Sequence, residues 1–204
     1  RRLERYLVAA RESRAAPVIV LTKSDLAEDV ETTVREVEAI SGGAPVVALS
    51  ARTGAGLDGV APWLKPGLTV ALLGSSGAGK STLLNALAGS ELMDTGAIRE
   101  SDDRGRHTTT HRELFKLPGG ALLIDTPGMR EFGVLAEDAA LEASFADVAE
   151  LMTQCRFGDC AHVTEPGCAV LAARTAGSLS EERWHAFLKL QKELDFEARK
   201  DDPK

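Results

Sequence analysis

A glycine-rich segment in the middle of the chain, residues 74–81, constrains the fold more than any other feature. Its sequence, GSSGAGKS, follows an apolar run at 68–73 and precedes a helix-like run at 82–87. This is the pattern of a phosphate loop, in the strand–loop–helix context that such a loop needs. The glycines let backbone N–H groups approach phosphate oxygens, and the helix start adds positive potential. We therefore expect a nucleoside triphosphate to contact Gly74, Ser75, Ser76, Gly77, Ala78, Gly79, Lys80, Ser81 and Thr82.

The same loop and a later aspartate predict a magnesium site. Lys80 is expected to neutralise charge on the β- and γ-phosphates, and Ser81 to offer its hydroxyl to Mg²⁺. Residues 113–117 and 121–124 are predicted to form an antiparallel hairpin, which ends in the sequence DTPG at 125–128. Asp125 can hold Mg²⁺ through water, and the N–H of Gly128 can face the γ-phosphate.

Two short segments before the phosphate loop have the chemistry to read a purine base. Each follows a predicted strand, the first at 17–21 and the second at 45–49. In the first segment, the carboxylate of Asp25 can accept from N1–H and the exocyclic amine of guanine, and the stem of Lys23 can lie over the ring. In the second, the backbone amides of Ser50 and Ala51 could meet the guanine oxygen. Taken singly, the first segment is more typical of a surface turn, and the second carries almost no signal.

The three cysteines of the chain all lie within residues 155–168, around one histidine. In a cytoplasmic protein such a cluster favours a metal over disulfides. Three thiolates and an imidazole fill a tetrahedral Zn²⁺ shell, so we expect a structural zinc site rather than a catalytic one. Unrelated buried thiols are the alternative. The predicted ligands are Cys155, Cys160, His162 and Cys168.

The composition sets limits on partners and on location. A net charge of −7 argues against nucleic-acid binding by the whole surface, and aromatic residues at 4% leave the core to aliphatic side chains. Neither a signal peptide nor an apolar run near the length of a membrane span is found, so we expect a cytoplasmic monomer without membrane contact. The chain does not begin with Met and is interpreted as a fragment. Helical periodicity predicts helices at 1–14, 29–40 and 180–200.

The order of these motifs resembles that of the circularly permuted GTPases, because the base-reading segments precede the phosphate loop. With the run GRHTTTHRE at 105–113 and the cysteine cluster, the chain resembles the ribosome small-subunit-dependent GTPase family over essentially all 204 residues. The resemblance implies an α/β fold: a circularly permuted phosphate-loop GTPase domain with a doubly wound, mostly parallel sheet at 1–138, and a helical zinc-binding domain at 139–204.

The resemblance also implies a function. The family hydrolyses GTP in late maturation of the small ribosomal subunit, which stimulates turnover, and switch motion is expected to reach the zinc domain. Expected partners are the small subunit, its rRNA, GTP and GDP, with structural Zn²⁺ and with Mg²⁺ bound alongside GTP. Thr109, or else its neighbour Thr108, is expected to bind Mg²⁺ and sense the γ-phosphate. His107 is proposed to position the attacking water, because Met129 stands where many GTPases have glutamine; a solvent-facing histidine is the alternative.

One stretch and two departures qualify this resemblance. The arginines of residues 94–112 form a basic patch suited to rRNA phosphates, unless they solvate the loop or pair with Asp102 and Asp103. An OB-fold domain usually precedes the first residue seen here, and this sequence lacks it. Thr22 stands where the base-reading motif usually has Asn, so we expect weaker bracing of the loop or weaker nucleotide binding. The four arginines of the basic patch named above are Arg99, Arg104, Arg106 and Arg112.

Two other functions compete with this interpretation. An ATPase of the transporter type has a similar phosphate loop, but it carries Glu where this chain has Thr126, and its SGG signature follows the loop instead of preceding it as at 41–43. A zinc-bearing RNA-binding module that uses GTP as a structural ligand is the second. It is expected to bind GTP without stimulated turnover.

Overall fold

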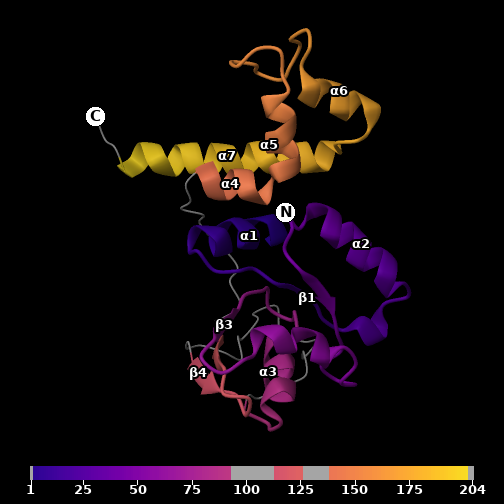
Figure 1. Cartoon of the computed structure of the whole chain (residues 1–204), viewed down its shortest axis with the longest axis vertical. Helices are drawn as coiled ribbons and strands as arrows, with labels where there is room; N and C mark the ends of the chain where they lie inside the picture. The colour runs from indigo at the N-terminus through magenta and orange to yellow at the C-terminus, as the bar shows by residue number, and fades with distance from the viewer. Residues whose placement is uncertain (1, 93–112, 126–137, 202–204) are drawn as a thin grey trace, which may run out of the picture. The chain divides into compact units, whose positions relative to one another are not determined.

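A computed structural model describes residues 2–92, 113–125 and 138–201 (Figure 1). The chain forms two compact units. The strand-containing unit consists of Val18–Glu36 and Val46–Phe132, and the helical unit of Arg1–Pro17, Val37–Pro45 and Gly133–Lys204. The domain boundary predicted at residue 138 stays a prediction.

Five short strands form two sheets within the described part of the strand-containing unit. Strand β1 (Ile19–Leu21) pairs in parallel with β2 (Val46–Ala48). The other sheet has the order β3-β5-β4, in which β3 (Thr69–Leu72) is parallel to β5 (Leu122–Asp125), and β4 (Glu113–Lys116) is antiparallel to β5. The predicted α/β class and the predicted hairpin are therefore confirmed.

Helix α3 (Lys80–Ala88) fixes the position of the glycine-rich loop that precedes it. Two adjacent leucines of α3 are buried in different apolar clusters: Leu84 packs with Leu117 and Leu123, whereas Leu83 packs with Leu49 and Val60. Because α3 contributes to both clusters, its first turn is held at the carboxyl end of β3. The buried members of both clusters are aliphatic, while Phe115 and Trp63 pack against them half-buried.

The remaining elements of the strand-containing unit are one helix and two short 3₁₀ segments. The segment η1 (Ser24–Leu26) follows β1, and η2 (Leu57–Trp63) follows β2. Helix α2 (Val30–Ile40) begins in this unit, and Asp29 accepts the backbone N–H of Thr32 at 2.9 Å as an N-terminal cap.

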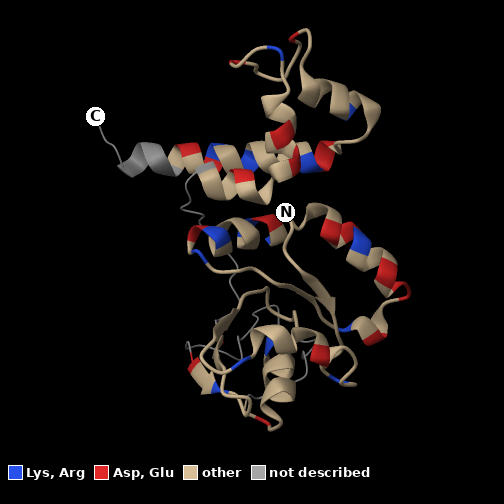
Figure 2. Ribbon diagram, in the orientation of Figure 1, with Lys and Arg blue, Asp and Glu red and all other residues tan. Residues whose placement is uncertain are grey.

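The helical unit contains α1 (Arg2–Glu12), α4 (Asp138–Ser144), α5 (Ala146–Thr153), α6 (Ala169–Ala176) and α7 (Glu181–Asp201). Its core includes a group of rings: Phe187 stacks on Trp184 at 5.6 Å and meets Phe145 edge-on at 5.5 Å, measured between centroids. Acidic and basic residues are interspersed along α7, and α2 carries one arginine between glutamates (Figure 2). Among the described helices, not one is long and apolar enough to cross a bilayer.

A buried arginine joins α1 to helices from the other end of the sequence. Arg183 of α7 donates to Asp147 at 2.7 Å and to the carbonyl of Ser144 at 2.9 Å. Its guanidinium lies 4.0 Å from the ring centroid of Phe145 and 3.7 Å from the buried carboxylate of Glu4 in α1. Charge pairing therefore places α1, the first helix of the chain, in the helical unit.

Candidate nucleotide site and metal centre

The phosphate loop has the backbone conformation that its glycines predict. Gly77 and Gly79 have φ values of 77° and 86°, in the left-handed region that residues with a Cβ rarely adopt. Gly79 caps α3, and its carbonyl accepts the N–H of Leu83 at 2.9 Å. The backbone N–H groups of the first turn of α3 are thus left for a ligand.

Lys80 and Asp125 lie at this loop. The ammonium of Lys80 donates to the carbonyls of Gly74 at 2.9 Å and Ser75 at 3.1 Å. Burial lowers the pKa of Lys80, and the carboxylate of Asp125 opposes that shift. Asp125 is fully buried at the end of β5, in register with Leu72 of β3. Parallel pairing therefore brings Asp125 to the edge from which the phosphate loop leaves.

Two hydrogen bonds hold the base-reading segment against the phosphate loop. The hydroxyl of Thr22 donates to the carbonyl of Ala78 at 2.7 Å, and the ammonium of Lys23 donates to that of Gly77 at 2.9 Å. The backbone of Lys23 is left-handed, with φ of 59°. Thr22 thus braces the loop despite replacing Asn.

Asp25 lies beside the second base-reading segment. Its side chain is 16% exposed and lies 3.5 Å from the guanidinium of Arg52. A hydrogen bond from Ser50 is the main cause that lowers the pKa of Asp25; burial opposes it, and Arg52 adds to it. The N–H of Ser24 donates to the carbonyl of Leu49 at 3.1 Å, which ties η1 to the end of β2.

A tight loop after β2 orients Ser50 and Ala51. Ser50 is buried, its N–H donates to the carbonyl of Ala55 at 2.8 Å, and its carbonyl accepts from Gly54 at 2.9 Å. Gly56 closes the loop with φ of 72°, and a Cβ there would lie 2.4 Å from the carbonyl oxygen of Ala48. The loop after β2 therefore requires glycine at position 56.

Several predicted site residues lie outside the described residues. This holds for the switch residues His107, Thr108 and Thr109, for Gly128 and Met129, and for the four arginines of the basic patch.

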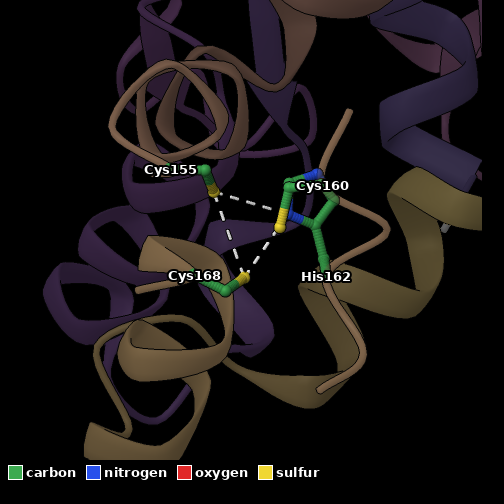
Figure 3. A group of neighbouring side chains, drawn as sticks. All are labelled: Cys155, Cys160, His162 and Cys168. Carbon is green, nitrogen blue, oxygen red and sulfur yellow. Dashed lines mark hydrogen bonds between the residues drawn. The ribbon is translucent and has the colours of Figure 1, made fainter. Parts of the chain in front are cut away.

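The four predicted metal ligands meet in the helical unit (Figure 3). Their ligand atoms all lie within 4.8 Å of one another. The Nδ1 atom of His162 is 3.5 Å from the sulfur of Cys155 and 3.5 Å from that of Cys168, and those two sulfurs are 4.0 Å apart. Cys160 completes the group, so the residues fit a metal ion with four protein ligands.

The pKa shifts of the cluster are mixed, because those of His162 and Cys155 favour metal binding and that of Cys160 opposes it. Burial lowers the pKa of His162, which keeps the imidazole neutral. Burial raises the pKa of Cys155. Hydrogen bonds, those from the N–H groups of Val170 and Ala169 foremost, lower the pKa by more than burial raises it, so the pKa lies below its ordinary value. Burial raises the pKa of Cys160 to about 11. The N–H of Leu171 donates to the sulfur of Cys168 at 3.3 Å.

Glu165 is a further residue of this centre that the sequence analysis missed. Its carboxylate accepts the N–H groups of Ala161, Val163 and Thr164, each at 2.9 Å. These backbone bonds, that of Val163 foremost, lower the pKa of Glu165 to about 2. Glu165 therefore orders the loop that presents Cys160 and His162. An acidic residue between two ligands was the available signal.

Known proteins match this chain closely. A family-wide sequence model described as RsgA GTPase matches residues 1–135. A protein of Opitutus terrae named small ribosomal subunit biogenesis GTPase RsgA is 55% identical over 100% of this chain and 56% of its own length. Its namesake RsgA 2 in Lactiplantibacillus plantarum is 52% identical over 97% of this chain and 55% of its own. The chain thus spans about half the length of the curated relatives it matches.

Solved structures agree with the family match. The crystal structure of YjeQ from Thermotoga maritima has a TM-score of 0.65 and 35% identity, covering 94% of this chain and 64% of YjeQ. YloQ, described as a circularly permuted GTPase, has a TM-score of 0.62 and 29% identity, covering 99% of this chain and 63% of YloQ. The fold, the permuted order of the motifs and the sequence match together show that this chain belongs to the RsgA GTPase family.

Proposed function

We propose that this chain binds and hydrolyses GTP and that it acts in assembly of the small ribosomal subunit. One observation carries the nucleotide part: the bonds from Thr22 to Ala78 and from Lys23 to Gly77 hold the base-reading segment against the phosphate loop. A single nucleotide can then contact Asp25 with its base and the loop with its phosphates.

In this proposal the two ends of the site have separate tasks. Asp25 accepts two N–H donors of guanine, while Ser50 fixes the carboxylate. The phosphate loop offers N–H groups and the ammonium of Lys80 to the phosphates. Mg²⁺ neutralises charge that develops on the phosphates, and Ser81, Asp125 and Thr109 are its proposed ligands. His107 is the proposed group that positions water, and Gly128 the proposed γ-phosphate contact.

We further propose that the metal of the Cys₃His cluster is zinc in a structural role. With zinc–sulfur distances of about 2.3 Å and a zinc–nitrogen distance of about 2.0 Å, a tetrahedron has edges of about 3.8 Å between sulfurs and about 3.5 Å from sulfur to nitrogen. The separations of 4.0 Å and 3.5 Å support this geometry. Four protein ligands leave no open position for catalysis.

The ribosomal part of the proposal rests on the names of the relatives, which are small ribosomal subunit biogenesis GTPases. Small-subunit rRNA is the proposed binding partner, and the cytoplasm and a monomeric state are the proposed location and assembly. Release of the γ-phosphate is proposed to change the switch residues and, through them, the zinc domain at 139–204.

The test is GTP turnover by this chain with and without purified small ribosomal subunits. We expect slow intrinsic turnover and stimulation by small subunits, with large subunits as the control. Lys80→Ala should abolish turnover, whereas Lys65→Ala, outside the phosphate loop, should not. Binding without stimulation would favour the RNA-binding alternative, and ATP displacing GTP at equal concentration would favour the transporter-type ATPase.

A further inference from the structure

Arg52 lies beside the carboxylate that is proposed to read the base. One guanidinium nitrogen, Nη2, is 3.5 Å from Oδ2 of Asp25. The two side chains differ in environment, because that of Arg52 is 79% exposed and that of Asp25 only 16%. Arg52 is therefore the more solvent-exposed partner of this ion pair.

The guanidinium of Arg52 carries the same kind of N–H donors as guanine, the base of the proposed ligand. The edge of guanine that faces a carboxylate consists of N1–H and the exocyclic amine on C2, which together form part of a cyclic guanidine. An arginine guanidinium offers the same fork of N–H donors. Arg52 thus places a donor of this kind in ion-pair contact, at 3.5 Å, with the acceptor that guanine is proposed to use.

We propose that Arg52 competes with the guanine base for Asp25 and thereby lowers the affinity of the site for guanine nucleotides. The inference rests on the proposed function, because it assumes that Asp25 binds the base. Arg52 occupies the carboxylate in the empty site, and an incoming base displaces it. As nucleotide leaves, Arg52 returns to the carboxylate.

The neighbouring groups favour Arg52 in this role. The ammonium of Lys23 is engaged with the carbonyl of Gly77, so it serves the phosphate loop. Ser50 is buried, and its hydrogen bond to Asp25 lowers the pKa of that carboxyl, which favours the charged acceptor. Arg52 gains little from packing, so it can leave at small cost.

Exposure also sets the size of the effect. Solvent-exposed ion pairs contribute little, and the corresponding change in affinity is about 1.5- to 5-fold. Salt weakens such pairs. Arg52 is therefore a modest and salt-sensitive competitor that adjusts affinity and does not block the site.

The test is a titration of the chain with fluorescently labelled GDP at low and high potassium chloride. Arg52→Ala should bind labelled GDP about 1.5- to 5-fold more tightly than the wild type at low salt. The difference should shrink at high salt. Arg52→Lys keeps the positive charge but lacks the forked pair of N–H donors. Its affinity for labelled GDP should lie between those of the wild type and Arg52→Ala. Arg35→Ala, which removes an exposed arginine of α2, is the matched control and should bind as the wild type does.

Removing Arg52 from the Asp25→Asn variant tests whether its effect on affinity depends on the carboxylate of Asp25. In Asp25→Asn, titrated with labelled xanthosine diphosphate, removal of Arg52 should change affinity less, because the amide carries no charge. Equal or weaker GDP binding by Arg52→Ala would overturn the inference, and weaker binding would mean that Arg52 contacts the base. If the wild type binds no guanine nucleotide, both this inference and the proposed function fail; if it binds and Arg52→Ala equals it, only this inference fails.

Discussion

At the scale of single residues, Thr22 shows how a departure from a motif can keep its contact. The motif usually has Asn at this position, and the sequence predicts weaker bracing. In the structure the Thr22 hydroxyl reaches the carbonyl of Ala78 at 2.7 Å. The backbone after β1 approaches the loop closely enough for the shorter side chain, since a Cβ on Gly79 would lie 3.6 Å from that hydroxyl.

Thr22→Val tests this brace, because it keeps the shape of the side chain and removes its donor. We expect the affinity for GDP to fall about 5- to 10-fold, as for the loss of one hydrogen bond of about 1 kcal/mol at a half-buried site. Thr22→Asn is the matched control and should bind at least as well as the wild type. Calorimetric titration measures both, and wild-type affinity in Thr22→Val would contradict the role of the hydroxyl.

The residues of both sites could be predicted only where chemistry ties them to a motif. The cysteine cluster was sufficient to predict that four potential metal ligands meet, and the base-reading role of Lys23 and Asp25 stays a prediction. The contacts of Arg52, Glu165 and Arg183 depend on loop conformation and on helix packing. Neither produces a periodic pattern in the sequence. Arg52 and Arg183 therefore emerge only from the structure, whereas the position of Glu165 between two metal ligands was a signal in the sequence.

At the scale of elements, the strands, the helices and the β4–β5 hairpin were predictable, but the grouping of the strands into sheets was not. The apolar runs at 45–49 and 68–73 became β2 (Val46–Ala48) and β3 (Thr69–Leu72), and the helix at 82–87 became α3 (Lys80–Ala88). An apolar run indicates which residues are buried. Burial extends beyond the residues whose backbones pair with a neighbouring strand, so the observed strands are shorter than the runs. The arrangement of the described strands as two sheets depends on long-range pairing, which a local pattern does not encode.

The loop that carries the proposed zinc ligands Cys160 and His162 provides a prediction at the element scale. Glu165→Ala removes the acceptor of three backbone N–H groups, so the loop loses order and zinc affinity should fall about 10- to 100-fold. Glu165→Gln keeps one acceptor oxygen and should lose less. Competition with a chromophoric chelator measures the affinities.

Asp159→Asn supplies the control for that experiment, because Asp159 is an exposed acid in the same loop. It should leave zinc affinity unchanged. Equal losses in Asp159→Asn and Glu165→Gln would mean that negative charge, and not the hydrogen bonds of Glu165, holds the loop.

At the scale of the whole molecule, the division into units does not follow the order of the chain. Helix α1 comes first in the sequence, yet it belongs to the helical unit: Arg11 donates to the Ser144 hydroxyl at 2.9 Å, and Arg5 pairs with Glu193 at 2.5 Å. The permuted motif order predicted the fold of the strand-containing unit. The place of α1 depends on charge pairs between ends of the chain, which its amphipathic pattern does not specify.

The buried arginine is the largest stability prediction at this scale. Arg183→Met leaves Glu4 and Asp147 without their shared cation, so the free energy of unfolding should fall by about 3–5 kcal/mol. The double variant Glu4→Gln with Arg183→Met should recover part of the loss. Urea unfolding followed by circular dichroism measures it.

Arg174→Met is the control on the same unit. Arg174 pairs with Glu181 at 2.8 Å, but the carboxylate partner is 51% exposed, so the loss should stay near about 1 kcal/mol. Equal losses in Arg174→Met and Arg183→Met would show that burial of the Arg183 cluster adds nothing.

The central claim is that Asp25 and the phosphate loop bind the two ends of one GTP molecule, and nucleotide preference of Asp25→Asn tests it most directly. The amide offers a donor to the 2-oxo group of xanthine and no longer accepts from two donors of guanine, so GTP affinity should fall about 100-fold or more while XTP becomes the preferred ligand. Asp29→Asn, which keeps the N-terminal cap of α2, should retain the preference for GTP. Retained GTP preference in Asp25→Asn would contradict the account.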